Sequence, residues 1–386
     1  MRKERKIYNC TLTPLTPIQV GNGNQIYPYN YVIKNGFYYR IELSEIIDKF
    51  PSKIKEEFIR LLENNNMIKI RSFIFDNYKK EYGYLYKAKI DKNVEDFYLK
   101  KIKGVELKNE ENQLIIEEFI GNHMGKFIPG STIKGALRNG FIFEEFKKDG
   151  YSYTLDREIE DRRGRKIPTA PFVLKNIDKK YEKTESDKRE AKILGLDKLE
   201  PKIDPFKNLI VTDTEICDNL IKIKKIERVS IKEKKGNMSM NNFEITKSLY
   251  SDNEENNLSF KIIINEYDIS EELLNTLLKG NIVTNKKNIY LENIFKHLNL
   301  KAKAILKEDI KFFDKAGEIN LTKISKKLLE QLENLKENEA LIRFGRGAGF
   351  NSTTLNLANN SDMVYTRVVS DDCPVGWAII SYKEKV

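Results

Sequence analysis

Histidine and cysteine, the side chains that most often build catalytic and metal sites, are scarce in this sequence. The chain has 386 residues but only two histidines, His123 and His297, and three cysteines, Cys10, Cys217 and Cys373. The cysteines are far apart and odd in number, so they fit neither a zinc-binding spacing nor a disulfide framework. We therefore expect no metal site, no cofactor and a reducing, cytoplasmic setting.

Long apolar runs are also missing. No stretch approaches the roughly 20 apolar residues of a membrane-spanning helix, and no apolar run of signal-peptide length follows the charged N-terminus. Hydrophobic residues still make up 40% of the chain and its length suffices for two domains, so we expect a folded protein. A net charge of +10 favours a polyanionic partner, although a lysine- and asparagine-rich genome would produce part of the same excess.

The segment Phe127–Arg138, with the sequence FIPGSTIKGALR, is the most informative part of the chain. A Pro-Gly pair ends the preceding segment, and Ser131 or Thr132 is expected to cap a helix that extends to about Lys148. Lys134 then falls in the first turn, where a cation opposes the helix dipole at a cost of roughly 0.3–1 kcal/mol. That position becomes favourable if an external anion, such as a phosphate, sits at the helix start.

Two basic side chains of this segment are expected to act together. Lys134 and Arg138 are four residues apart and therefore share one helical face. They could bind phosphates, or they could be two solvated cations on an ordinary capped helix. The residues of this segment leave both interpretations open.

A glycine-rich segment at 341–354 has Gly345, Gly347 and Gly349 at alternate positions. Glycine permits positive φ and keeps side chains away from the backbone, so consecutive N–H groups could meet an anion. The alternative is a tight turn that needs glycine for its own geometry. Arg346 lies among the glycines, and Asn351, Ser352, Thr353 and Thr354 follow as amide and hydroxyl donors. The segment matches neither a Walker loop nor a dinucleotide-binding loop.

Together these two segments resemble the RAMP superfamily of CRISPR-associated proteins. The resemblance rests on FIPGSTIKGALR at 127–138 and RFGRGAGFNSTT at 343–354. Further support comes from LTPLTPIQVGNG at 12–23, LIVTDTEI at 209–216 and DDCPVGWAII at 371–380. Motif order and chain length are most similar to the family of fifth subunits of type III-A Csm effector complexes.

The resemblance implies two ferredoxin-like domains of the RNA-recognition-motif type, whereas periodicity alone indicates only an α+β fold. We place the first domain at 1–150, with a helical insertion at about 44–113. A charged connection follows at 151–204. The second domain covers 205–386, with a helical insertion at about 268–340 and the glycine-rich loop.

Periodicity also predicts individual elements. A hairpin is expected around Asn35-Gly36 and a helical stretch from Ser44 to about Lys80. The charged residues 84–113 are expected to form exposed helix or loop. Leu209–Ile216 is expected to be a central strand, and Ile221–Ile231 a further strand.

By resemblance, the chain is a non-catalytic subunit that binds CRISPR RNA, caps the complex at the 3′ end of the guide and supports guide maturation. Its expected partners are the backbone and small subunits of the Csm complex and separate trimming nucleases. The candidate RNA-binding residues are Gly130, Ser131, Thr132, Lys134, Arg138, Gly345, Arg346, Gly347, Gly349, Asn351, Ser352 and Thr353.

Two alternatives belong to the same superfamily. One is a repeat-RNA endoribonuclease with His123 as the general base. The other is a subunit of a Cmr-type complex. Two carboxylate pairs could bind Mg²⁺, namely Asp213 with Glu215 and Asp371 with Asp372, but the first also fits a solvated strand edge. We therefore expect neither catalysis nor metal binding.

Overall fold

The computed structural model describes most of the chain outside its most charged segments. The described residues are 3–64, 66–104, 114–148, 158–160, 166–168, 190–191, 193–194, 196, 201, 204–231, 239–245, 257–267, 291–359, 365–370 and 373–384. Asp371 and Asp372, one of the two candidate carboxylate pairs, lie outside this set.

A five-stranded antiparallel sheet forms the centre of the larger lobe. Its order is β11-β14-β1-β18-β15, so the first strand of the chain lies between a strand from the second half and the last strand. The strands are β1 (Lys3–Pro14), β11 (Leu209–Val211), β14 (Leu258–Tyr267), β15 (Glu339–Arg343) and β18 (Trp377–Glu384).

A second, larger sheet follows the order β2-β6-β13-β12-β5-β4-β3, and β16 joins β12 and β17. The pairs β12–β5 and β13–β6 are parallel, because the β12–β13 hairpin from the second half of the chain inserts between β5 and β6. The bounds are β2 (Gly21–Ile26), β3 (Tyr31–Lys34), β4 (Phe37–Arg40), β5 (Tyr86–Ile90), β6 (Ile116–Phe119), β12 (Ile221–Ser230), β13 (Ser239–Ile245), β16 (Thr366–Ser370) and β17 (Cys373–Pro374). Both sheets therefore combine strands from both halves of the sequence.

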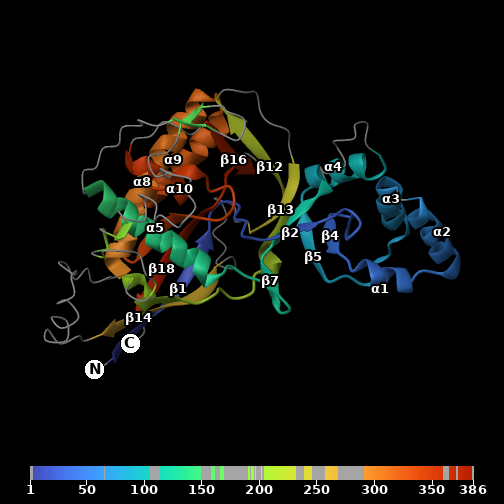
Figure 1. Ribbon diagram of the computed structural model, residues 1–386, viewed down its shortest axis with the longest axis horizontal. Coiled ribbons are helices and arrows are strands. Elements are labelled where there is room, and N and C mark those ends of the chain that lie inside the picture. Colours follow the sequence, from blue (N-terminus) through green and yellow to red (C-terminus); the bar gives the residue numbers. More distant parts are fainter. Residues whose placement is uncertain are drawn as a thin grey trace.

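Helices cover the sheets on opposite sides of the molecule (Figure 1). The helices α5 (Gly130–Lys148), α8 (Leu291–Lys315) and α9 (Ile319–Glu333) lie with the five-stranded sheet. The helices α1 (Leu43–Asp48), α2 (Ser52–Glu63) and α3 (Met67–Asn77) pack on β3 and β4, and α4 (Lys92–Ile102) follows β5.

Short elements complete the described chain. They are the strands β7 (Gly121–Asn122), β8 (Gly125–Lys126), β9 (Glu158–Glu160) and β10 (Lys166–Pro168), the helix α10 (Phe350–Thr353), and the 3₁₀ turns η1 (Lys80–Tyr82), η3 (Pro205–Asn208), η4 (Asp218–Leu220) and η6 (Asn356–Asn359).

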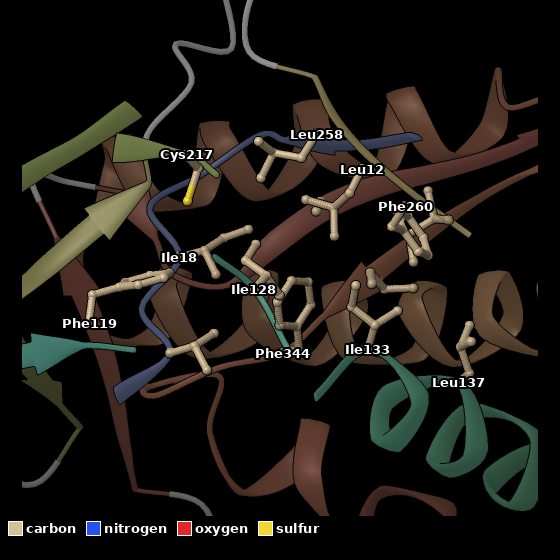
Figure 2. Close-up of a cluster of buried hydrophobic side chains, with 14 of the residues drawn as sticks. Leu12, Ile18, Phe119, Ile128, Ile133, Leu137, Cys217, Leu258, Phe260 and Phe344 are labelled. Carbon is tan, nitrogen blue, oxygen red and sulfur yellow. The ribbon is translucent and has the colours of Figure 1, made fainter. Parts of the chain in front are cut away.

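The main core joins α5 to both sheets. Figure 2 shows Ile133 and Leu137 of α5 turned toward Leu12 and Phe260 of the five-stranded sheet, and all four are buried. Phe344, directly before the glycine-rich turn, belongs to the same cluster. Burial of these side chains, at about 1.5–3 kcal/mol each, fixes the start of α5 and the glycine-rich turn on one shared core.

Several predicted elements agree with the structure. Helix α5 ends at Lys148 as expected, and β12 covers the predicted strand. The hairpin at Asn35-Gly36 joins β3 and β4, and both turn residues have positive φ, as a two-residue type I′ turn requires.

Other predictions were wrong in detail. Leu209–Ile216 is not a central strand, because β11 has three residues and lies at the edge of its sheet. The residues 84–113 are not only helix and loop, since β5 lies among them and pairs with β4 and β12. The expected helical stretch from Ser44 to Lys80 is three separate helices, because Pro51 and Asn66 each start a new one.

Candidate functional site

The start of α5 is already occupied by a carboxylate of this chain. The helix begins at Gly130, whose N–H donates to Asp213 Oδ1 at 2.7 Å. Gly130 lies so close to the backbone of Val211 and Thr212 that a Cβ there would collide with both. The predicted caps Ser131 and Thr132 therefore lie inside the first turn, and an internal acid stabilises the helix dipole.

The two cations of α5 differ in their surroundings, although they share a face as predicted. Arg138 Nη2 lies 2.8 Å from Asp204 Oδ2, a second guanidinium nitrogen pairs with Glu190, and the guanidinium stacks over the Phe206 ring at 5.6 Å. Partial burial lowers the pKa of Lys134, and the nearby Asp204 opposes this shift. Lys134 makes no ion pair with any described residue, whereas Arg138 pairs with two carboxylates of the chain and its side chain is 25% exposed.

The glycine-rich turn has the backbone conformation that its sequence predicts. Gly345, Gly347 and Gly349 have φ values of +86°, +78° and +86°. Gly345 lies against the backbone of Gln19, so that a Cβ there would come within 2.5 Å of the Gln19 carbonyl oxygen. Gly347 faces the side chains of Val368 and Val375 in the same way. Two of the three glycines are therefore required by contacts within the protein.

Arg346 divides its bonding between the protein and the solvent. Its backbone N–H donates to Gln19 O at 2.7 Å, so this group is not available to an external anion. Its side chain pairs with Glu117 of β6 but remains 51% exposed. A Cβ at Gly349, which precedes α10, would make an ordinary contact with Gly347 O at 3.9 Å. In that short helix Asn351 and Ser352 are buried and Thr353 is exposed.

The two sequence motifs meet at a set of hydrogen bonds that we call the motif junction, formed by Asn139, Lys301, Ser352 and Thr353. Asn139 Nδ2 donates to Thr353 O at 3.1 Å, and Lys301 Nζ donates to Ser352 O at 2.7 Å and to Asn139 Oδ1. These bonds join α5 to α10 through α8. Burial lowers the pKa of Lys301 to about 7.

Sequence reasoning missed Lys301, because it looks like one of many helical lysines. The only available signal is its position: Leu298, Ala302 and Ile305 on the same helix are buried, so Lys301 falls among buried positions of α8.

A buried charge cluster of Asp309, Arg343 and Arg367 lies next to the glycine-rich segment. Arg343 Nη1 and Arg367 Nε each lie 2.7 Å from a different oxygen of Asp309. Arg343 also donates to Val375 O at 2.9 Å and stacks over the Trp377 ring at 5.3 Å. Nothing in the sequence identifies Asp309, 34 positions away, as the partner of Arg343.

The candidate catalytic and metal-binding groups are dispersed. His123 is exposed in the turn between β7 and β8, whereas His297 is buried against the Phe141 ring. Asp213 and Glu215 serve structural roles, because Glu215 Oε1 accepts from Ser259 N at 2.9 Å. Among the described residues, no group of His, Cys, Asp or Glu could hold a metal ion. No helix within the described ranges is long and apolar enough to cross a membrane.

Comparison with known families identifies the class of protein. A family model described as RAMP superfamily matches residues 11–352, and the chain belongs to this superfamily. The site agrees with this assignment, since both matching motifs lie on the same core.

Individual relatives are more specific. The chain is 24% identical, over 349 residues, to a protein of Methanocaldococcus jannaschii named CRISPR system Cms protein Csm5, covering 88% of this chain and 71% of that protein. Its fold is similar to a chain of a Csm–crRNA–target RNA ternary complex from a type III-A CRISPR-Cas system, with a TM-score of 0.60, 16% identity and coverage of 97% and 100%. The crystal structure of T. onnurineus Csm5 gives the same TM-score and identity, with coverage of 96% and 99%.

Proposed function

We propose that this chain is a non-catalytic RNA-binding subunit of a type III-A Csm complex that caps the 3′ end of the CRISPR RNA. The observation that carries the proposal is the motif junction, where two segments 214 residues apart in sequence share hydrogen bonds. Its similarity to Csm5 proteins supports the choice of complex. The partners would be the CRISPR RNA, the backbone and small subunits and separate trimming nucleases, in the cytoplasm.

The proposed RNA contacts are narrower than the full set of twelve candidate residues. Lys134 makes no ion pair with a described residue and the Arg346 side chain is 51% exposed, so these two cations are the proposed phosphate contacts. Ser131 and Thr353 are exposed hydroxyl residues of the same two segments, and the Thr353 hydroxyl already donates to Gly349 O at 3.2 Å. The guanidinium of Arg138 is held by internal carboxylates, so we propose that Arg138 shapes this surface without contacting RNA. Such contacts would recognise phosphates irrespective of base sequence, because base pairing by the guide reads the target.

The proposal includes the domain plan. We propose ferredoxin-like units over 1–150 and 205–386 with a charged connection at 151–204. Because each sheet contains strands from both segments, these units would share their sheets and could not be separated as independent bodies.

Salt-dependent guide binding tests the proposal directly. Replacing both Lys134 and Arg346 by Ala should weaken CRISPR RNA binding and reduce the slope of log K against log salt by up to about two counterions. Lys147→Ala is a matched control, since Lys147 is exposed on the same helix about 20 Å from Lys134. Reconstituted complexes with the double variant should carry guides of altered length.

Unchanged affinity, slope and guide length in a folded double variant would reject the RNA contact. Cleavage of repeat RNA by the purified chain, abolished by His123→Ala, would instead support the endoribonuclease alternative. We expect no cleavage, because no described carboxylate or hydroxyl bonds to His123 to orient it.

A further inference from the structure

Three polar side chains, each more than nine-tenths buried, line one cavity at the motif junction. Lys301 is 5% exposed, Ser352 6% and Arg343 7%. They come from three different elements, α8, α10 and β15. The rest of the lining is apolar and consists of Ala136, Leu298, Ala302, Ile305, Leu341 and Ile342. No carboxylate of the described residues lines the cavity.

The hydrogen-bonding capacity of this lining is incompletely used. Arg343 Nη2 and Ser352 Oγ have no hydrogen-bond partner among the described residues, although both atoms are buried. Buried polar atoms are almost always paired, so unpaired donors from two residues of one cavity indicate a ligand that accepts hydrogen bonds. Lys301 Nζ has three protons and donates to two oxygens, Asn139 Oδ1 and Ser352 O.

The net charge of the groups around the cavity indicates the sign of the ligand's charge. Lys301 and Arg343 are the charged residues in the described lining, and Arg343 pairs with Asp309, which also pairs with Arg367. Arg343 and Arg367 share the single carboxylate of Asp309, so the three residues together have a net charge of +1. Protonated Lys301 adds a second positive charge. Uncompensated buried charge is unfavourable unless a counter-charge accompanies it.

We propose that this cavity binds one small monovalent anion of the size of chloride, held by Lys301, Arg343 and Ser352. The cavity has a volume of about 20 Å³, which admits a single small ion. The anion would bridge α8, α10 and β15 and thereby stabilise the glycine-rich segment from the inside. This inference does not depend on RNA binding and is tested without RNA.

The first test compares melting temperatures in sodium chloride and in sodium gluconate at equal ionic strength. Gluconate is too large for the cavity. Chloride should raise the melting temperature of the full chain by about 2–4 °C, a shift typical of one occupied weak site. The rise should be larger at pH 6 than at pH 9, because deprotonated Lys301 no longer attracts the ion.

Lys301→Met should abolish the chloride effect, whereas Lys307→Met, at an exposed position of the same helix, should preserve it. Equal melting temperatures of the natural chain in the two salts would overturn the proposal, as would a full chloride effect in Lys301→Met.

A second measurement covers the case in which Lys301→Met does not fold. Crystals of the natural chain grown in sodium bromide should show a bromine anomalous peak within hydrogen-bonding distance of Lys301 Nζ and Arg343 Nη2. A water molecule at that position without anomalous signal would refute the anion site, and normal RNA binding in the same preparation would leave the proposed function intact.

Discussion

The two motif segments use their polar groups in opposite ways. At the start of α5, Asp213 accepts from the Gly130 N–H and two carboxylates pair with Arg138, so Lys134 is left as the cation without an ion pair to a described residue. In the glycine-rich turn the backbone is fixed from within, while the Arg346 side chain stays half exposed. A phosphate would therefore contact a surface whose polar groups are mostly already bonded within the protein.

This difference separates residues that build the surface from residues that could touch a ligand. Sequence similarity to a family motif highlights both kinds equally, because both are needed for the local structure. Bonding partners and exposure distinguish them, and substitutions can test the distinction one segment at a time.

The largest effect is expected beneath the glycine-rich segment. Asp309→Asn removes the single negative charge between Arg343 and Arg367 and leaves two arginines buried without compensation. We expect the free energy of unfolding to fall by about 3–5 kcal/mol, the range found when one partner of a buried ion pair is removed. Urea denaturation of the purified chain measures this. Glu308→Gln, at the preceding position, should have little effect, because the ion pair of Glu308 with a described residue is the surface pair with Lys311.

A smaller effect should separate two glycines of similar φ. Gly345→Ala and Gly349→Ala both introduce a side chain at φ +86°, but only the first places a Cβ against backbone, at Gln19. We expect Gly345→Ala to lower the free energy of unfolding by roughly 2–4 kcal/mol, at least about 1 kcal/mol more than Gly349→Ala. Equal destabilisation would mean that backbone strain alone, without close approach, explains these glycines.

The smallest effect concerns the two cations of α5. Arg138→Ala should cost about 1–2 kcal/mol of unfolding free energy, because Asp204 and Glu190 lose their partner and Phe206 loses its stacking contact. Lys134→Ala should stay within about 0.5 kcal/mol. Thermal and urea unfolding of both variants measure this difference in unfolding free energy. A stable Arg138→Ala variant that loses CRISPR RNA would reverse the roles that we assign to these residues.

Local patterns were sufficient for features that depend on neighbours in sequence. The span of α5, the type I′ turn at Asn35-Gly36, the shared face of Lys134 and Arg138 and the positive φ of the alternating glycines follow from such patterns. Each depends on residues within a few positions of one another.

The missed features depend on partners that are distant in sequence. The sequence indicates only that Asp213 is a strand residue, because its partner Gly130 is 83 positions away and is brought to it by the fold. The sequence pattern suggests a solvated Lys301, because its hydrogen-bond partners Asn139 and Ser352 are distant in sequence. Periodicity also placed β11 at the centre of its sheet, because an apolar run cannot distinguish an edge strand held under a helix from a central one.

The interleaving of the sheets has a consequence for synthesis on the ribosome. Strands β5 and β6 leave the ribosome long before the β12–β13 hairpin that lies between them in the sheet. Strand β1 is synthesised early but pairs with β18, which is synthesised late. Until then the early strands present unpaired edges, which favour aggregation or incorrect pairing. Such long-range pairing also predicts slow folding. The nascent chain should therefore depend on chaperones until nearly its whole length has emerged, and expression of residues 1–150 alone should yield insoluble material.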